Sequence, residues 1–300
     1  MKCESYSRGK LLLTGEYLVL KGGEGIALPL KVGQYMRTEP LHDNKIIWET
    51  TYKSNIIFQA TFSLFDFSIT RATDNTMASY LQRIFKKVAE YSRFPNGMMI
   101  KTELEFPFNW GLGSSSTLIN NIATCFDIDA FKINNAITGG SGYDIACARS
   151  EKPIIYKSMG ESPLFYEIDW KPPFSGNIYF AYTGHKQNSE KEVSQFLRKN
   201  LKISEYLKKL ENINQRILRV KTLEAFEEQI GKHDNLLSEI TGKNPASQAI
   251  LPGFPGKIKW LGAWGGDFIL LTWRENKNEL KRYLKRHNLS IFFQWNEIIK

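Results

Sequence analysis

The chain has 300 residues, of which 42% are hydrophobic and 24% charged, and its formal net charge is +9 at pH 7. This composition is typical of a folded globular protein and excludes disordered and fibrous classes. The longest largely apolar run, Phe268–Trp273, is far shorter than the ~20 residues that span a membrane. The positive charge suits an anionic partner such as a nucleotide or a phosphorylated metabolite, and solvated basic helices would give the same balance.

The cysteines and the N-terminal residues indicate a cellular compartment. Cys3, Cys125 and Cys147 are too few and too scattered to predict a disulfide framework, and they form no C-x-x-C pair for zinc. The first residues contain no apolar core of a signal peptide. We therefore expect reduced cysteines, no membrane partner and a cytoplasmic location.

The first part of the chain predicts mostly strands. An apolar run over Lys10–Leu20 contains a glycine turn, and two β-rich segments, Lys45–Thr51 and Ile56–Phe62, predict a hairpin. Apolar residues at helical spacing predict a helix over Asn75–Tyr91. A strand at residues 98–106 and a helix over Ser115–Phe126 follow.

The rest of the chain predicts a linker and a helix-rich second half. Past residue 144 we expect a short helix, a strand over Pro153–Ser158 and a linker over Trp170–Gly176. Further strands are expected over Asn177–Tyr182, Lys257–Leu261, Phe268–Trp273 and Ser290–Trp295, and helices over Ser189–Leu201, Ser204–Val220, Thr222–Ile240 and Asn276–Asn288. The order of strands first, then helices with late strands, favours an α+β fold.

The most informative segment runs from Pro107 to Thr117 and reads PFNWGLGSSST. Glycines let main-chain N–H groups approach an anion, and the N-terminus of the following helix adds unpaired donors and a positive dipole end. The serine hydroxyls could hold phosphate oxygens or complete a magnesium shell. No G-K-[ST] follows, so this is not a P-loop. A serine cap after a flexible turn would leave the same pattern.

Three other segments carry candidate chemistry. Asp144 follows a run of glycines, where a carboxylate either caps a helix or accepts a proton. Lys259–Phe268 contains a glycine turn that could form a hairpin loop or a backbone wall against phosphates. Ser7–Tyr17 places Lys10 at the start of an apolar strand, where a solvated lysine would be ordinary.

Together the four segments resemble the GHMP kinase superfamily, which includes galactokinase and the homoserine, mevalonate and phosphomevalonate kinases. Gly9–Tyr17 is similar to its first motif, Pro107–Ser116 to its P-x-x-x-G-L-G-S-S phosphate loop and Lys259–Phe268 to its glycine-rich third motif. Gly142–Asp144 and Gly265–Asp267 look like the versions in phosphomevalonate kinases, whereas the first motif fits mevalonate kinases equally well.

The resemblance implies a two-domain α+β fold. An N-terminal domain similar to ribosomal protein S5 domain 2 would bind ATP over residues 1–172, and a ferredoxin-like domain would cover residues 173–300. It implies transfer of the ATP γ-phosphoryl group to mevalonate or phosphomevalonate in isoprenoid precursor synthesis. The expected partner is a small-molecule substrate, without nucleic acid or membrane, for a monomer or homodimer.

The same resemblance implies the site residues, with ATP and Mg²⁺ as cofactors. Asp144 and Lys10 would be catalytic, and Ser115 would be a metal ligand. The ATP-binding loop would comprise Gly111, Leu112, Gly113, Ser114, Ser115 and Ser116, and the third motif Gly262, Ala263, Gly265 and Gly266. Substrate binding would fall to Glu16, Tyr17, Tyr143, Lys186 and Ser189, with Lys186 and Arg149 as cations for a phosphorylated acceptor.

Two departures from the family pattern leave alternatives open. Trp264 replaces a small residue of the third motif, and its indole could crowd the phosphates or stack on a ring. Residues 117–143 contain no glutamate to match the metal ligand of mevalonate kinases. The alternatives are a nucleotide-binding protein with impaired catalysis, and a kinase for another small alcohol such as homoserine or a sugar. An S5-like nucleic-acid-binding protein is a more distant third.

Overall fold

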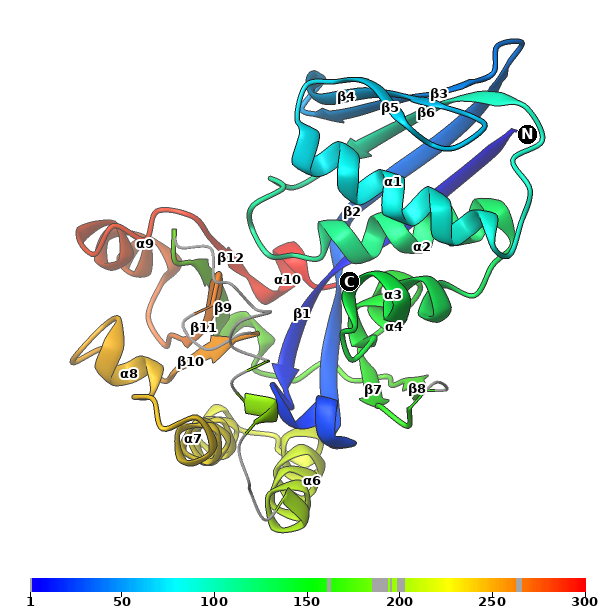
Figure 1. The fold of residues 1–300 in the computed structure, drawn as a ribbon. Helices are drawn as coiled ribbons and strands as arrows, with labels where there is room; N and C mark the ends of the chain where they lie inside the picture. Colours follow the sequence, from blue (N-terminus) through cyan, green and yellow to red (C-terminus); the bar gives the residue numbers. More distant parts are fainter. Residues whose placement is uncertain (1, 161–162, 185–193, 195, 199–202, 263–265) are drawn as a thin grey trace. The chain divides into compact units, whose positions relative to one another are not determined.

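The computed structural model describes residues 2–160, 163–184, 194, 196–198, 203–262 and 266–300 (Figure 1). Its contacts divide the chain into two compact units. Unit 1 comprises Met1–Lys10, Val32–Phe108 and Leu112–Arg149, and unit 2 comprises Leu11–Lys31, Asn109–Gly111 and Ser150–Lys300. The units are therefore not consecutive segments of the chain, and the expected division at residue 172 stays a prediction. The combination of mainly antiparallel sheets with separate helices confirms the α+β class.

Unit 1 consists of a sheet in the order β5-β4-β3-β6-β2 with helices against it (Figure 1). The strands are β1 (Cys3–Thr14) and β2 (Glu24–Leu41), which both continue into unit 2, and β3 (Lys45–Tyr52), β4 (Asn55–Ser63), β5 (Ile69–Ala72) and β6 (Gly97–Leu104). The helices are α1 (Asn75–Ala89), α2 (Ser114–Phe126), α3 (Ala130–Thr138) and α4 (Tyr143–Ala148). The antiparallel pairing of β3 with β4 confirms the predicted hairpin.

The core of unit 1 lies between the sheet and α1, as the helical spacing predicts. Asp74 caps α1 by accepting hydrogen bonds from the amides of Thr76 and Met77. Phe85 of this helix is fully buried and packs against Trp48 and Phe62 of the hairpin, with ring centroids 5.9 and 5.1 Å away. Aromatic burial of this size is a main source of stability for such a layer.

Buried polar side chains fix α2 against β1 and β2. Ser7 Oγ donates to Asn121 Oδ1 at 2.8 Å and accepts from Asn120 Nδ2 at 2.9 Å. Thr117 Oγ1 donates to Gln34 Oε1 at 2.7 Å. A buried polar group without a hydrogen-bond partner destabilises the folded state, so these bonds favour one placement of α2. They therefore hold the serine-rich start of α2 at a defined place beside β1.

One expectation about the cysteines is wrong. Cys3 at the start of β1 and Cys125 near the end of α2 form a disulfide, with their Cα atoms 5.7 Å apart, whereas Cys147 is a buried free thiol. A separation of 122 residues gives no local signal, because the pairing depends on β1 lying beside α2. The prediction of a fully reduced set came from number and spacing alone.

Unit 2 contains a four-stranded antiparallel sheet in the order β10-β11-β9-β12, and β7 and β8, which continue from β2 (Figure 1). The strands are β7 (Ile154–Lys157), β8 (Leu164–Glu167), β9 (Ile178–Tyr182), β10 (Ile258–Leu261), β11 (Phe268–Thr272) and β12 (Phe292–Gln294). The helices are η1 (Leu18–Lys21), η2 (Ser175–Asn177), α6 (Ile203–Arg219), α7 (Leu223–Thr241), α8 (Ala246–Ala249), α9 (Lys277–Arg286) and α10 (Trp295–Ile298).

Most elements of unit 2 follow the sequence prediction. The strands β9, β10, β11 and β12 and the helices α6, α7 and α9 all fall within a few residues of the expected bounds. Most of the helix expected over residues 189–201 lies outside the described residues. Within the described part of the chain, no helix combines the length and apolar character that crossing a membrane requires.

Candidate active site

The serine-rich loop leads into an α-helix whose first turn is not capped. Gly113 is the N-cap of α2 with a φ of +97°, and no side chain of the described residues caps this end. Ser116 Oγ donates instead to the Gly113 carbonyl at 2.9 Å. The first amides of such a helix are donors for an anion, and the helix dipole favours negative charge there. The first turn of α2, at Ser114–Ser116, is therefore suited to phosphate.

Lys10 of β1 lies directly against this loop. Its amide donates to the Leu112 carbonyl at 2.9 Å. A Cβ atom on Gly113 would lie 3.1 Å from Lys10 Cγ, so the glycine leaves room for the lysine side chain. Lys10 Nζ donates to Tyr143 OH at 2.9 Å and lies 5.3 Å from the centroid of that ring. The structure thus brings one cation, the loop and the first residue of α4 together within unit 1.

Asp144, the second residue of α4, belongs to the same cluster. It is half-buried, and α4 packs against α2. Burial raises the pKa of Tyr143 to about 12, with the Lys10 charge opposing and the Asp144 charge adding to the shift. Burial likewise raises the pKa of the Cys147 thiol, and the same two charges act on it. The charges of Lys10 and Asp144 therefore both act on Tyr143 and Cys147, whose raised pKa values keep them protonated at neutral pH.

In unit 2, the start of the loop packs against the strand after the third motif. A Cβ atom on Gly111 would lie 1.8 Å from Asp267 Oδ2, so only glycine fits beside this carboxylate. Trp110 stacks on Tyr182 with ring centroids 5.5 Å apart and meets Phe268 edge-on at 6.0 Å. Asp267 lies within the third motif, but its contact with Gly111 has no local signal in the sequence.

No protein-family model and no curated protein matches this chain. Solved structures do match it over nearly their whole length. Methanococcus jannaschii mevalonate kinase is similar with a TM-score of 0.72 at 18% identity, over 98% of this chain and 97% of that one. Streptococcus pneumoniae phosphomevalonate kinase, in complex with phosphomevalonate and AMPPNP, is similar with a TM-score of 0.70 at 17% identity, over 97% and 99%.

A third match is Lactococcus lactis galactokinase complexed with galactose, with a TM-score of 0.69 at 14% identity, over 97% of this chain and 92% of that one. The chain has the GHMP kinase fold. This confirms the GHMP kinase fold that the motifs predicted, whereas the S5-like and ferredoxin-like domains stay predictions. The kinase activities named here belong to those proteins, which differ from one another in the acceptor they bind.

The GHMP kinase fold places the predicted metal ligand, Ser115, beside α1. Ser115 Oγ and Tyr80 OH form a hydrogen bond, so a phenol from α1 holds the hydroxyl. Among the described residues, no group of three or more His, Cys, Asp or Glu side chains could hold a metal ion. Mg²⁺ keeps several waters and takes phosphate oxygens as ligands. The donor set therefore fits a magnesium ion that arrives with a nucleotide, and it does not form a separate protein metal site.

Two residues of this chain that were predicted to bind substrate are buried in unit 2. Glu16 and Tyr17 follow β1, and only 1% and 5% of their surfaces are exposed. Glu16 Oε1 accepts a hydrogen bond from Lys259 Nζ, and the Tyr17 ring packs against Phe196 at 5.4 Å. Their contact with substrate stays a prediction, although neither side chain is exposed here. The other substrate candidates, Lys186 and Ser189, lie outside the described residues.

The third motif is described only in part. Gly262 follows β10 with a φ of +76°, which favours glycine, and Gly266 precedes Asp267 at the start of β11. Ala263, Trp264 and Gly265 lie outside the described residues. The predicted phosphate contact of this motif, and the effect of the indole, therefore stay predictions.

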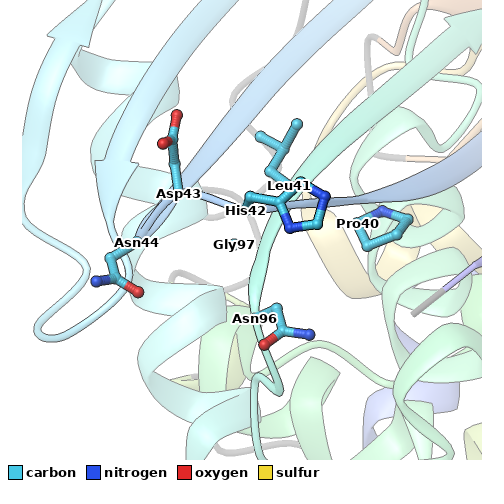
Figure 2. Close-up of a pocket in the computed structure, with 7 residues that line it drawn as sticks. All are labelled: Pro40, Leu41, His42, Asp43, Asn44, Asn96 and Gly97. Carbon is cyan, nitrogen blue, oxygen red and sulfur yellow. The ribbon is translucent and has the colours of Figure 1, made fainter.

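A pocket of about 190 Å³ lies at the turn between β2 and β3, and no predicted site residue is among those that line it (Figure 2). It is lined by Pro40, Leu41, His42, Asp43, Asn44, Asn96 and Gly97. Asp43 forms an exposed ion pair with Lys45 at 2.6 Å, and a Cβ atom on Gly97 would lie 1.7 Å from the Asp43 carbonyl oxygen. The close packing of the turn accounts for this glycine, and none of the seven residues forms a catalytic pair.

Proposed function

We propose that the protein is an ATP-dependent small-molecule kinase, with mevalonate or phosphomevalonate as its phosphoryl acceptor. One observation carries the proposal: Lys10 contacts the loop at Leu112 and Gly113 and also binds Tyr143, next to Asp144. An uncapped helix start for phosphate, a cation and a carboxylate are the parts that phosphoryl transfer requires.

The solved structures support this choice of reaction. The proteins that share the fold include mevalonate kinases, a phosphomevalonate kinase with a bound ATP analogue, a galactokinase and a heptose phosphate kinase. Their acceptors differ, so the fold alone leaves the substrate open. Gly142–Asp144 and Gly265–Asp267 resemble the phosphomevalonate kinase motifs, which is why the two mevalonate-pathway acceptors come first.

Each residue of the cluster has a defined task in this mechanism. When bound, magnesium-ATP supplies the phosphoryl group and part of the neutralising charge. The first amides of α2 and the hydroxyls of Ser114–Ser116 bind phosphate oxygens. Lys10 neutralises charge near Gly113. Because phosphoryl transfer has a loose transition state, positioning and charge neutralisation account for most of the catalysis.

The role of Asp144 depends on the acceptor. A hydroxyl group, as in mevalonate, needs a general base, and Asp144 would accept its proton. A phosphate group arrives ionised, so Asp144 would orient it and balance charge. That second case needs an additional cation, for which Arg149 is a candidate: it ends α4, and its guanidinium carbon lies 5.7 Å from the Phe131 ring centroid.

A coupled ADP-release screen tests the proposal. The protein is incubated with magnesium-ATP and, in turn, mevalonate, phosphomevalonate, homoserine and galactose. We expect acceptor-dependent ADP release with one of the first two. ADP release with homoserine or galactose alone would contradict the mevalonate-pathway acceptors and still support a kinase activity. Nucleotide binding without release for any acceptor would favour a nucleotide-binding protein with impaired catalysis, which the missing glutamate in residues 117–143 also suggests.

A further inference from the structure

Four ionisable side chains are buried together in unit 2, and the proposed mechanism uses none of them. They are Glu16 after β1, His233 and Asp234 of α7, and Lys259 of β10, each no more than 3% exposed. We call them the buried quartet. Lys259 Nζ donates to Glu16 Oε1 and to the Trp260 carbonyl at 2.7 Å. A buried lysine thus holds the residue that follows the turn at Gly15.

His233 binds the backbone of the same turn. Its Nε2 atom accepts a hydrogen bond from the Gly15 amide at 3.0 Å. A ring nitrogen that accepts a hydrogen bond carries no proton. This imidazole is therefore neutral, and its single ring proton lies on Nδ1. Burial, with the nearby charge of Lys259, holds the pKa of His233 well below its ordinary value. The contact of Gly15 with α7 therefore requires the neutral histidine.

The turn at Gly15 allows no other residue. Its φ is +95°, and a Cβ atom there would lie 2.8 Å from the Gly25 Cα atom and 3.1 Å from the Glu24 carbonyl oxygen. The turn at Gly15 directly follows β1, five residues after Lys10, and β10 carries Lys259 at the start of the third motif. The quartet thus connects the end of the first motif to the strand that begins the third.

Stability alone does not account for this cluster. Within the described part of the chain, Glu16 Oε2, His233 Nδ1 and Asp234 Oδ1 are buried without a hydrogen-bond partner. Unpaired buried polar atoms lower stability, and apolar residues of the same size commonly replace a buried ion pair at no loss. A polar cluster with three unpaired atoms therefore needs a further reason.

We propose that Glu16, His233 and Lys259 are positioning residues that hold the Gly15 turn against α7 and β10, and that Glu16 is therefore not a substrate ligand. The inference rests on the proposed function, since both connected motifs would face nucleotide or acceptor. Within the quartet, the charge of Asp234 also acts on Glu16. Outside it, Lys257, whose Nζ atom would lie 2.7 Å from a Cβ on Gly231 of α7, acts on Asp234.

The first experiment compares two variants of His233. In His233→Gln the side-chain oxygen takes the place of Nε2 and still accepts from Gly15, whereas His233→Phe keeps a ring but leaves the amide unpaired. Hydrogen–deuterium exchange at Gly15 should stay slow in His233→Gln and become about 10–100-fold faster in His233→Phe. The kcat/KM for ATP should fall about tenfold in His233→Phe only. Unchanged exchange and kcat/KM in His233→Phe would overturn the proposal.

The second experiment separates positioning from substrate binding. Glu16→Gln and Lys259→Met each leave an unbalanced buried group, so each should lower the Tm by about 5–10 °C. The double variant Glu16→Gln/Lys259→Met should recover most of this loss, because replacing both partners removes the unbalanced charge. The double variant still lacks the hydrogen bond between Lys259 and Glu16. Assayed well below its Tm, it should therefore have a kcat/KM about tenfold lower than that of the wild type.

The kinetics of the single variants decide between the two roles. As positioning residues, Glu16 and Lys259 act through the same turn, so both single variants should change the KM values and kcat in parallel. A raised acceptor KM in Glu16→Gln that Lys259→Met does not reproduce would assign Glu16 to the substrate. Wild-type kcat/KM in a fully stable double variant would also contradict the proposal.

The failure of the proposed function is distinguishable from the failure of this inference. The exchange rate at Gly15 and the Tm values require no turnover, so they test the quartet even if no acceptor releases ADP. Conversely, the wild-type chain can phosphorylate its acceptor while the Gly15 amide stays protected in His233→Phe. That result would support the proposed kinase function and contradict the positioning role.

Discussion

Lys10 Nζ donates a hydrogen bond to Tyr143 OH at 2.9 Å, so the cation of β1 is held by the residue that precedes Asp144. The lysine is fixed at its backbone as well, since its amide bonds to the Leu112 carbonyl at 2.9 Å. A lysine side chain has several rotatable bonds, and each partner reduces the freedom that must be lost when it binds a phosphate. Tyr143 therefore pre-positions the charge on which the proposed mechanism depends.

We predict that Tyr143→Phe lowers kcat/KM for ATP about tenfold, because a hydrogen bond to a charged group contributes about 1.5–3 kcal/mol. The ring and its contact with the lysine remain, so the fold should be unaffected. Steady-state kinetics with circular dichroism checks this. Tyr91→Phe is the matched control, since Tyr91 is exposed and its hydroxyl and ring also contact a lysine, Lys87, that is not a predicted site residue. Equal kinetics for both variants would remove Tyr143 from the mechanism.

For Asp144→Asn we predict a fall in kcat of about 100-fold or more with a hydroxyl acceptor, the lower end of what general base catalysis contributes. With a phosphate acceptor the loss should be smaller, because no proton has to be removed. The ADP-release assay measures both. Asp127→Asn is the control, since Asp127 is exposed and asparagine tolerates its left-handed backbone. Near-normal turnover in a folded Asp144→Asn protein would exclude a catalytic role.

Ser115→Ala should weaken the use of magnesium-ATP while the Tm changes little, because within the described part of the chain the half-buried hydroxyl bonds only to Tyr80. We expect the KM for magnesium-ATP to rise about 5–10-fold, the loss of one hydrogen bond to a charged ligand. Tyr80→Phe is the control variant, since it keeps the serine hydroxyl and removes its protein partner. Because Tyr80 holds the hydroxyl, a smaller loss in Tyr80→Phe agrees with this role, whereas an unchanged KM in a folded Ser115→Ala protein would exclude the serine from nucleotide binding.

Local patterns predicted the parts of this protein that depend on neighbours in sequence. The hairpin of β3 and β4 and the start of α2 at Ser114 follow from turn residues, strand propensity and the change of period. β2 was not predicted, because Gly25, Pro29 and Gly33 interrupt its alternation. Its strand character comes from pairing with β6 and β7, which no short window contains.

The candidate site shows the same limit. The motifs predicted Lys10, Asp144 and the serines as site residues, and these roles stay predictions. The structure places Lys10 against the loop at Leu112 and Gly113 and against Tyr143, the neighbour of Asp144. Tyr80 and His233 were missed, because a tyrosine or histidine on an amphipathic helix is normally a packing residue and gives no signal. Lys259 lies in a recognised motif, yet its bond to Glu16 joins residues 243 positions apart. Such contacts are decided by how the elements pack.

The disulfide between Cys3 and Cys125 should stabilise the protein measurably. It closes a loop of more than 120 residues, and cross-links of long loops contribute about 2–4 kcal/mol by restricting the unfolded chain. We predict that reductant lowers the free energy of unfolding by this amount in urea titrations. The double variant Cys3→Ala/Cys125→Ala should show the lower stability without reductant and no response to it. A wild-type chain that is indifferent to reductant would mean that the bond does not form in solution.

The buried quartet should also make stability depend on pH. Burial raises the pKa of Glu16 from 4.5 to about 7, against the opposing charge of Lys259, and that of Asp234 from 3.8 to about 6. The folded chain therefore binds these protons more tightly than the unfolded chain. Their stabilising contribution is complete below the unfolded pKa values and is lost as the pH rises to about 7.

His233 acts in the opposite direction, because its lowered pKa makes the unfolded chain bind its proton first on acidification. Variants of Glu16 and of His233 separate the two effects on the free energy of unfolding. Glu16→Gln should remove a rise in the free energy of unfolding on the order of 3 kcal/mol between pH 7.5 and 4.5. His233→Gln should remove the opposing fall below pH 6.5. Urea unfolding at a series of pH values measures both slopes, and a Glu16→Gln curve parallel to that of the wild type would show that Glu16 does not titrate in this range.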